Sequence, residues 1–368
     1  MGSALNPSIR ESMRKVGNDY SNIERNFARA VRKELCDLTV GGANGDGGLG
    51  GSPAAFTGIA ERLSVVVCTY NGGNTLPLLL AALERQRHRG FEVVIVDDGS
   101  DRPVEPLVRA AALSVPVTLV RSRRNRGVAT ARNLGLTVAD GDSVVFLDDD
   151  MRPPPTMTGS LALRQTHAAG CVFVGFREDV SAERFFADDP KPPRTERDWR
   201  CHSRRGPGEY LFLAADQNAP RVHRSEFSTV RDTDYFKALG HGRVFEFWDL
   251  PGLMSGHSVC LKRADAVAAG GFAEEYFRGW GAEDLAFGAV LAARGHYVVP
   301  ALDWVSLHLR QEGRHAGGRA AERESLRRNF ARYLSYIGEP LGRRQLPSHW
   351  LRPTGRAVGG VETYEVRN

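Results

Sequence analysis

The sequence lacks the long apolar runs and paired cysteines that mark several classes of protein. No uninterrupted apolar segment approaches the roughly 20 residues that are needed to span a bilayer. The N-terminal residues do not form the apolar core of a signal peptide, because Glu11, Arg14 and Lys15 interrupt them. The five cysteines are odd in number, widely scattered and without a C-x-x-C pair, which argues against a disulfide framework or a zinc site. We therefore expect a soluble, cytoplasmic protein without a transmembrane segment.

Neither the amino-acid composition nor the net charge of the sequence is extreme. Apolar residues make up 42% and charged residues 25% of the 368 residues, which is typical of globular proteins and enough for one large domain with additions, or for two. The net charge of +5 is compatible with an anionic ligand or a peripheral membrane contact, and equally with a merely arginine-rich protein. No nucleic-acid partner is expected, and the oligomeric state is left open.

The periodicity of apolar residues changes along the chain and divides it into regions. The N-terminal region has apolar positions at helical spacing, and its partner could be the protein body, another subunit or a membrane, with the body preferred. An arginine-rich helix is expected over residues 317–337. The regions are residues 1–40, a helical extension; 41–61, a Gly-rich linker; 62–310, the main domain, with halves at 62–155 and 156–310; and 311–368, a C-terminal helical region and tail.

Short apolar segments alternate with helical periodicity from residue 63 onward. This alternation predicts a parallel, doubly wound α/β sheet. Ligands of such sheets bind beyond the carboxyl ends of the strands. The expected strands are residues 63–68, 91–96, 117–120 and 144–147, with helices at 76–86, 104–113 and 127–138 between them; further strands are expected at 172–176 and 255–261, and a helix at 285–293.

Three polar clusters directly follow predicted strands. They are Thr69-Tyr70-Asn71, residues 97–101 and Asp148-Asp149-Asp150. Because the clusters fall at one edge of the sheet, they predict a ligand site. The three adjacent carboxylates repel one another at neutral pH, and a site that keeps them together usually supplies a cation. For this last stretch alone, a solvated acidic turn is the alternative.

A second informative stretch lies at Gly279–Asp284. Two glycines flank Trp280 and lead into the paired carboxylates Glu283 and Asp284 at the start of a predicted helix. Carboxylates there are favoured by the helix dipole, so helix capping is the alternative to a chemical role.

Together these motifs resemble family 2 glycosyltransferases of the GT-A fold. The first half matches at residues 65–71, at 96–100, at 125–127 with 131–133, and at the D-x-D of residues 148–150. Residues 280–284 resemble the Trp-Gly-x-Glu-Asp signature of the chondroitin-polymerase and galactosyltransferase-like members. The resemblance implies a Rossmann-like, doubly wound mixed sheet. It also implies inverting, metal-dependent transfer of a sugar from a nucleoside diphosphate, with UDP preferred, to a glycan, a peptide or a small molecule.

For the donor, the resemblance implies that Thr69 and Asp98 hold the nucleobase. Arg126 or Arg132 could reach the pyrophosphate; Arg126 is preferred, because Arg132 could lie on a solvated helix face. The full set of implied donor-binding residues is Thr69, Tyr70, Asn71, Asp98, Arg126, Asp148 and Asp149.

For the metal, the resemblance implies that Asp150 coordinates Mn²⁺ or Mg²⁺ bridging the diphosphate. Asp148 would contact the ribose or the same ion. Oxygen ligands from one or two carboxylates and substrate phosphates suit such ions. His308 would complete the metal shell, with His315 as the fallback.

For the acceptor, the resemblance implies that Asp284 is the general base. An alcohol needs such a base because it is a poor nucleophile until its proton is removed. Glu283 would bind the acceptor or the donor sugar, and Trp280 with Gly281 would line a sugar face.

Alternatives to these assignments stand beside them. For Asn71 and Asn133, turn and helix-packing roles are favoured over direct catalysis. A nucleotidyltransferase is disfavoured, because no Gly-rich phosphate loop with a lysine follows the first strand. A catalytically silent nucleotide-sugar or glycan-binding protein would keep the fold for another role.

Overall fold

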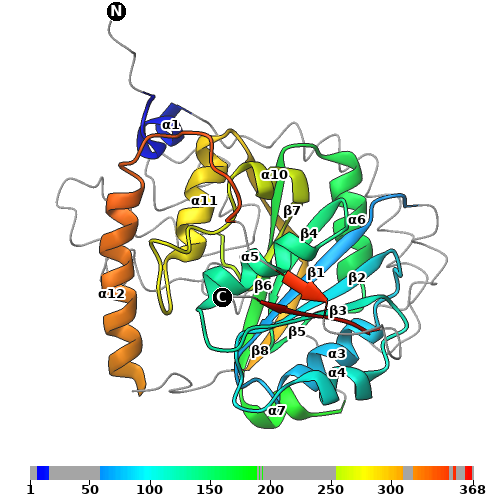
Figure 1. Cartoon of the computed structure of the whole chain (residues 1–368). Helices are drawn as coiled ribbons and strands as arrows, with labels where there is room; N and C mark the ends of the chain where they lie inside the picture. The colour runs from blue at the N-terminus through cyan, green and yellow to red at the C-terminus, as the bar shows by residue number, and fades with distance from the viewer. Residues whose placement is uncertain are drawn as a thin grey trace, which may run out of the picture.

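The computed structural model describes most of the predicted main domain and parts of the N-terminal and C-terminal regions (Figure 1). His315, most of the linker and most of the N-terminal extension lie outside the described residues. None of the described helices is long and apolar enough to cross a membrane. The described residues are 6–15, 59–188, 190, 193, 254–309, 318–347, 351–353 and 361–366.

The described strands form one mixed sheet in the order β5-β8-β6-β7-β4-β1-β2-β3-β10-β9. Strands β3, β2, β1 and β4 are parallel, whereas β7 runs antiparallel to β4 and β6. The predicted α/β class and mixed sheet are therefore confirmed. The strands are β1 (Leu63–Thr69), β2 (Phe91–Asp97), β3 (Val117–Arg121), β4 (Ser143–Asp148), β5 (Met151–Arg152), β6 (Cys171–Val180), β7 (Ser258–Lys262), β8 (Tyr297–Leu309), β9 (Leu351–Pro353) and β10 (Val361–Val366).

The central strands are apolar along their length because helices cover both faces of the sheet. Right-handed crossovers from β1 to β2 to β3 put α3 and α4 on one face, and the return to β4 puts α5 on the other. Figure 1 shows the helices around the sheet. They are α3 (Leu76–Glu84), α4 (Glu105–Ala111), α5 (Val128–Val138), α6 (Met157–His167), α7 (Ala182–Phe186), α10 (Arg263–Ala268), α11 (Glu283–Ala293) and α12 (Gly318–Tyr336).

The described parts of the N-terminal and C-terminal regions pack on this body. Helix α1 (Ile9–Lys15) packs against α11 through buried Ile9 and Met13, as expected for an extension that docks on the protein body. The C-terminal strand β10 pairs in parallel with β3 and was not predicted, because the tail from residue 343 shows no clear periodicity.

Candidate active site

The carboxyl ends of β1, β2 and β4 lie side by side. In the parallel register, Cys68 pairs with Val96 of β2 and with Asp148 of β4. The residues that follow these three strands therefore emerge at one edge of the sheet, so the three predicted polar clusters lie together.

Asp149 ties the end of β4 to the end of β1. Its carboxylate accepts a hydrogen bond from the hydroxyl of Thr69 at 2.5 Å, and both residues are buried. A Cβ atom at Gly72 would lie 1.6 Å from Asp149 Oδ2, so this approach requires glycine. The side chain of Thr69 thus faces a neighbouring strand end rather than open solvent.

The two asparagines of the motifs both have structural contacts. Asn71 has a φ of 56°, and its side chain donates to Asp101 Oδ2 and accepts the Asp101 backbone N–H. Such bonding is typical of asparagine in turns. On α5, Asn133 donates to the backbone carbonyl of Phe272 and accepts its N–H, both at 2.8 Å. Tyr70, beside the Asn71 turn, is exposed at the sheet edge.

Asp98 holds the loop that leads into α5. Its carboxylate accepts backbone N–H bonds from Arg126 at 2.9 and 3.0 Å and from Gly127 at 2.8 Å. Burial raises the pKa of Asp98 to about 6, although these two backbone donors favour its ionised form. Gly99 has a φ of 78°, and a Cβ there would lie 2.4 Å from the backbone of Arg124. Asp98 and Gly99 therefore bring the loop with Arg126 to the sheet edge.

His308 lies between two carboxylates. Its Nδ1 atom is 2.8 Å from Asp179 Oδ1, and its Nε2 atom is 3.6 Å from Asp150 Oδ1. This placement follows from strand pairing, because β8 lies between β5 and β6 and sets His308 opposite Met151 and Asp179. The ring also stacks on that of His257, with centroids 6.2 Å apart.

The chemistry of Asp150 and His308 fits a divalent cation. An Nδ1–H donated to Asp179 fixes the imidazole and leaves Nε2 facing Asp150, an arrangement that commonly supports metal-binding histidines. In the part of the chain that the structure describes, no three His, Cys, Asp or Glu side chains gather as ligands. The phosphate oxygens of a substrate would have to complete the shell, as is usual for Mg²⁺.

Arg132 is the centre of a second cluster. It is buried on α5, donates from Nη1 to Glu283 Oε1 at 2.8 Å, and donates from Nη2 to Asp148 Oδ1 at 3.1 Å. Its guanidinium lies over the ring of Phe272, 5.3 Å from the centroid. A Cβ at Gly256 would lie 2.3 Å from this guanidinium, so the glycine makes room for it. The interpretation of Arg132 as part of a solvated helix face is therefore wrong.

Glu283 and Asp284 have different surroundings although they are adjacent. Glu283 is buried and also accepts the backbone N–H of Gly281 at 3.1 Å. Burial and the charge of Asp284 raise the pKa of Glu283 to about 7, while Arg132 opposes the shift. Asp284 is partly open to solvent and accepts the backbone N–H of Gly256 at 3.2 Å. The more accessible carboxylate is thus the one expected to act as a base.

The loop before α11 has an unusual backbone. Gly279, Gly281 and Ala282 have φ values of 82°, 101° and 68°, all in the left-handed region. For alanine this conformation is strained, on the order of 1 kcal/mol, and persists only where the surroundings fix it. The loop presents Trp280 with 43% of the residue exposed.

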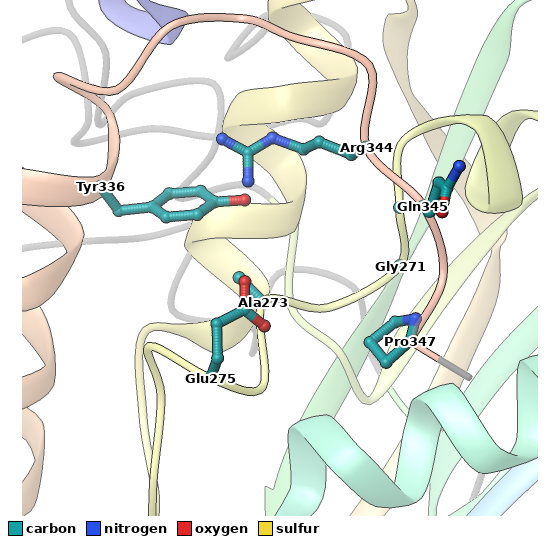
Figure 2. A pocket seen from close by; sticks show the side chains of 8 residues that line it. Gly271, Ala273, Glu275, Tyr336, Arg344, Gln345 and Pro347 are labelled. Atoms are coloured by element: carbon teal, nitrogen blue, oxygen red, sulfur yellow. The ribbon is translucent and has the colours of Figure 1, made fainter. Parts of the chain in front are cut away.

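Two cavities are lined in part by the segment that precedes this loop, and neither is lined by a residue of the D-x-D. One of about 300 Å³ is lined by Glu275, Tyr276, Arg278 and Arg332. The other, of about 150 Å³, lies where residues 270–275 meet the C-terminal segment (Figure 2). There Arg344 lies over the ring of Tyr336, 4.5 Å from the centroid.

Three residues of the site were not predicted from the sequence. Asp179, Gly256 and His257 reach it because β6 and β7 pair next to β4 and β8. Since β7 is antiparallel to β4, its first residue, Ser258, pairs with Leu147 and brings residues 256–257 to the carboxyl end of β4. Strand direction cannot be read from a local pattern, so the sequence held no signal for these three residues.

Residues 64–221 match the family model described as "Glycosyl transferase family 2". This chain carries a family 2 glycosyltransferase domain. Its match begins one residue into β1, and it includes the strand ends and the D-x-D described above.

Known proteins similar to this family 2 chain are named for different activities. Validoxylamine A glucosyltransferase from Streptomyces hygroscopicus subsp. jinggangensis is 29% identical over 313 residues, which cover 83% of this chain and 67% of that protein. Hyaluronan synthase from Pasteurella multocida is 28% identical over 251 residues, covering 64% of this chain and 23% of that protein. The solved mannosyltransferase PcManGT from Pyrobaculum calidifontis, in complex with GDP-Man and Mn²⁺, has a TM-score of 0.46 at 19% identity, covering 85% of this chain and 76% of that one. This chain spans only 23% to 33% of the length of several curated relatives.

Proposed function

We propose that this chain transfers a sugar from a nucleoside diphosphate sugar, with UDP preferred, to an acceptor hydroxyl with inversion at the anomeric carbon. The observation that carries the proposal is the buried Arg132 bridge between Asp148 of the D-x-D and Glu283 of the Glu-Asp pair. The bridge supports a single site in which a donor and an acceptor meet. The family 2 domain supports the class of reaction.

On the donor side, Asp98 and the loop it holds would receive the nucleobase, and Arg126 would face the pyrophosphate. Asp150 and His308, with Asp148, would hold Mn²⁺ or Mg²⁺. When bound, such an ion stabilises the negative charge of a departing diphosphate.

On the acceptor side, Asp284 would remove the proton of the attacking hydroxyl. The acceptor oxygen forms a bond to the anomeric carbon, and the bond from that carbon to the diphosphate oxygen breaks. The nucleoside diphosphate leaves with the electron pair, and Asp284 keeps the proton. Glu283 would accept a hydrogen bond from a sugar hydroxyl, and Trp280 would cover a sugar face.

The test starts with a thermal-shift screen of UDP-, GDP- and other nucleotide sugars with and without Mn²⁺, because a ligand that binds only the folded state raises its stability. Nucleoside diphosphate release and the anomeric configuration of the product are then measured with three kinds of acceptor. These are hyaluronan oligosaccharides and validoxylamine A, chosen because two relatives carry these compounds in their names, and a peptide mixture. We expect Mn²⁺-dependent UDP release and an inverted product by NMR. Stabilisation without UDP release would instead indicate a silent binding protein, and retained configuration would refute the inversion.

A further inference from the structure

We propose that α12 belongs to the acceptor site, where Ser325 and Asn329 are positioning residues that fix the loop carrying Trp280. This inference rests on the proposed function, because it assigns the loop to the acceptor. The loop needs support from outside, since its left-handed residues Gly279, Gly281 and Ala282 form no regular helix or strand.

Ser325 satisfies both backbone polar groups of Trp280. Its Oγ atom accepts the Trp280 N–H at 3.2 Å and donates to the Trp280 carbonyl at 2.9 Å. One hydroxyl can do this because it has one donor hydrogen and two acceptor lone pairs. The backbone of Trp280 is therefore fixed while its side chain stays partly exposed.

Asn329 lies one turn further along the same face of α12. It is buried, and its Nδ2 atom donates to the carbonyls of Trp280 at 3.1 Å and Arg278 at 3.2 Å. Its Oδ1 atom accepts a hydrogen bond from Arg332 at 3.0 Å, which fixes the orientation of the amide. Leu326, which lies between these two polar residues in the sequence, packs against Gly281 of the loop.

The packing of α12 leaves little freedom for this loop. A Cβ at Gly281 would lie 2.6 Å from Leu326 Cδ1, so the loop approaches the helix as closely as glycine allows. The helix itself is anchored by Tyr336, whose ring packs edge-on against Tyr276 and Phe277 at centroid distances of 4.9 and 5.8 Å. Figure 1 shows α12 standing beside α11 and the loop that precedes it.

The loop also links the helix to the buried carboxylate. Gly281, next to Trp280, donates its backbone N–H to Glu283, which Arg132 connects to Asp148. A movement of Trp280 would therefore displace the groups around the acceptor while leaving the carboxyl ends of β1 and β2 intact. A substitution in α12 that frees this loop should therefore change the acceptor KM more than it changes hydrolysis of the donor.

Ser325→Ala is the test, because alanine favours the helix and removes only the hydroxyl. Arg327→Ala is the matched control on the same helix, since the Arg327 side chain is 80% exposed. We measure Mn²⁺-dependent hydrolysis of the UDP-sugar and transfer to whichever acceptor is turned over in the UDP-release assay. For Ser325→Ala we expect the acceptor KM to rise about tenfold or more, as for a misplaced substrate-positioning group, with hydrolysis within about twofold of the unaltered chain.

A second readout follows Trp280 directly. In the 5-fluorotryptophan-labelled chain, Trp280→Phe assigns one ¹⁹F resonance, and Ser325→Ala is expected to shift or broaden that resonance while Arg327→Ala leaves it unchanged. An unchanged acceptor KM, or equal losses of hydrolysis and transfer, would overturn the role of α12. Failure of the unaltered chain to release UDP would instead overturn the proposed function itself.

Discussion

The guanidinium of Arg132 donates a hydrogen bond to the carboxylate of Glu283, 151 residues further along the chain. Both side chains are buried, and the second arm of the guanidinium reaches Asp148. A buried ion pair adds little net stability when intact, but removing one partner leaves an uncompensated charge. Arg132 therefore joins the D-x-D to the Glu-Asp pair, and its removal would leave carboxylates of both motifs without their cation.

Arg132→Met is expected to lower the free energy of unfolding by about 3–5 kcal/mol, because the buried carboxylate of Glu283 loses its cation. Urea denaturation at pH 8 measures the change. Arg327→Met is the control and should change stability by less than about 0.5 kcal/mol. Equal stabilities of the two variants would contradict the buried bridge.

The raised pKa of Glu283 gives stability a pH dependence. Between its ordinary pKa of 4.5 and the folded value of about 7, the folded chain binds the proton that the unfolded chain has lost. Stability from this group is therefore present at low pH and is lost as the pH rises through this window, by at most about 1.4 kcal/mol per pH unit.

Glu283→Gln tests this dependence because glutamine resembles the protonated carboxyl and does not titrate. The difference in unfolding free energy between Glu283→Gln and the unaltered chain is measured from pH 4 to 8. We expect the variant to gain stability relative to the unaltered chain as the pH rises toward 7. A difference that stays constant would mean that Glu283 has an ordinary pKa.

Asp179 is predicted to support metal binding without touching the metal. Asp179→Asn weakens the hydrogen bond that orients His308, and loss of such a contact typically reduces metal affinity about 10- to 100-fold. Isothermal titration calorimetry with Mn²⁺ in the presence of UDP measures the change in metal affinity. Asp265→Asn is a matched control, because Asp265 pairs with His296 at 3.6 Å in a different part of the fold. Equal Mn²⁺ affinities in the two variants would remove His308 from the metal site.

The sequence was sufficient where structure is set locally. β1 and β2 are short apolar runs bounded by polar turns, and their ends match the prediction to within one residue. The surroundings of Arg132 could not be predicted, because its burial depends on Gly256 and Glu283 from distant segments. The hydrogen bonds of Ser325 with Trp280 are equally non-local, since α12 shows only the periodicity of an amphipathic helix in sequence.

Turnover by Asp284→Asn is the most direct test of sugar transfer at this site. The partly open carboxylate of Asp284 is the proposed base, and asparagine keeps its shape without its basicity. UDP release and UDP-sugar binding are measured for the unaltered chain and for Asp284→Asn, with Mn²⁺ and the acceptor present. We expect rapid UDP release by the unaltered chain and a loss of about 10²-fold or more in the variant, with donor affinity unchanged. Equal rates of UDP release in the two proteins would contradict this expectation.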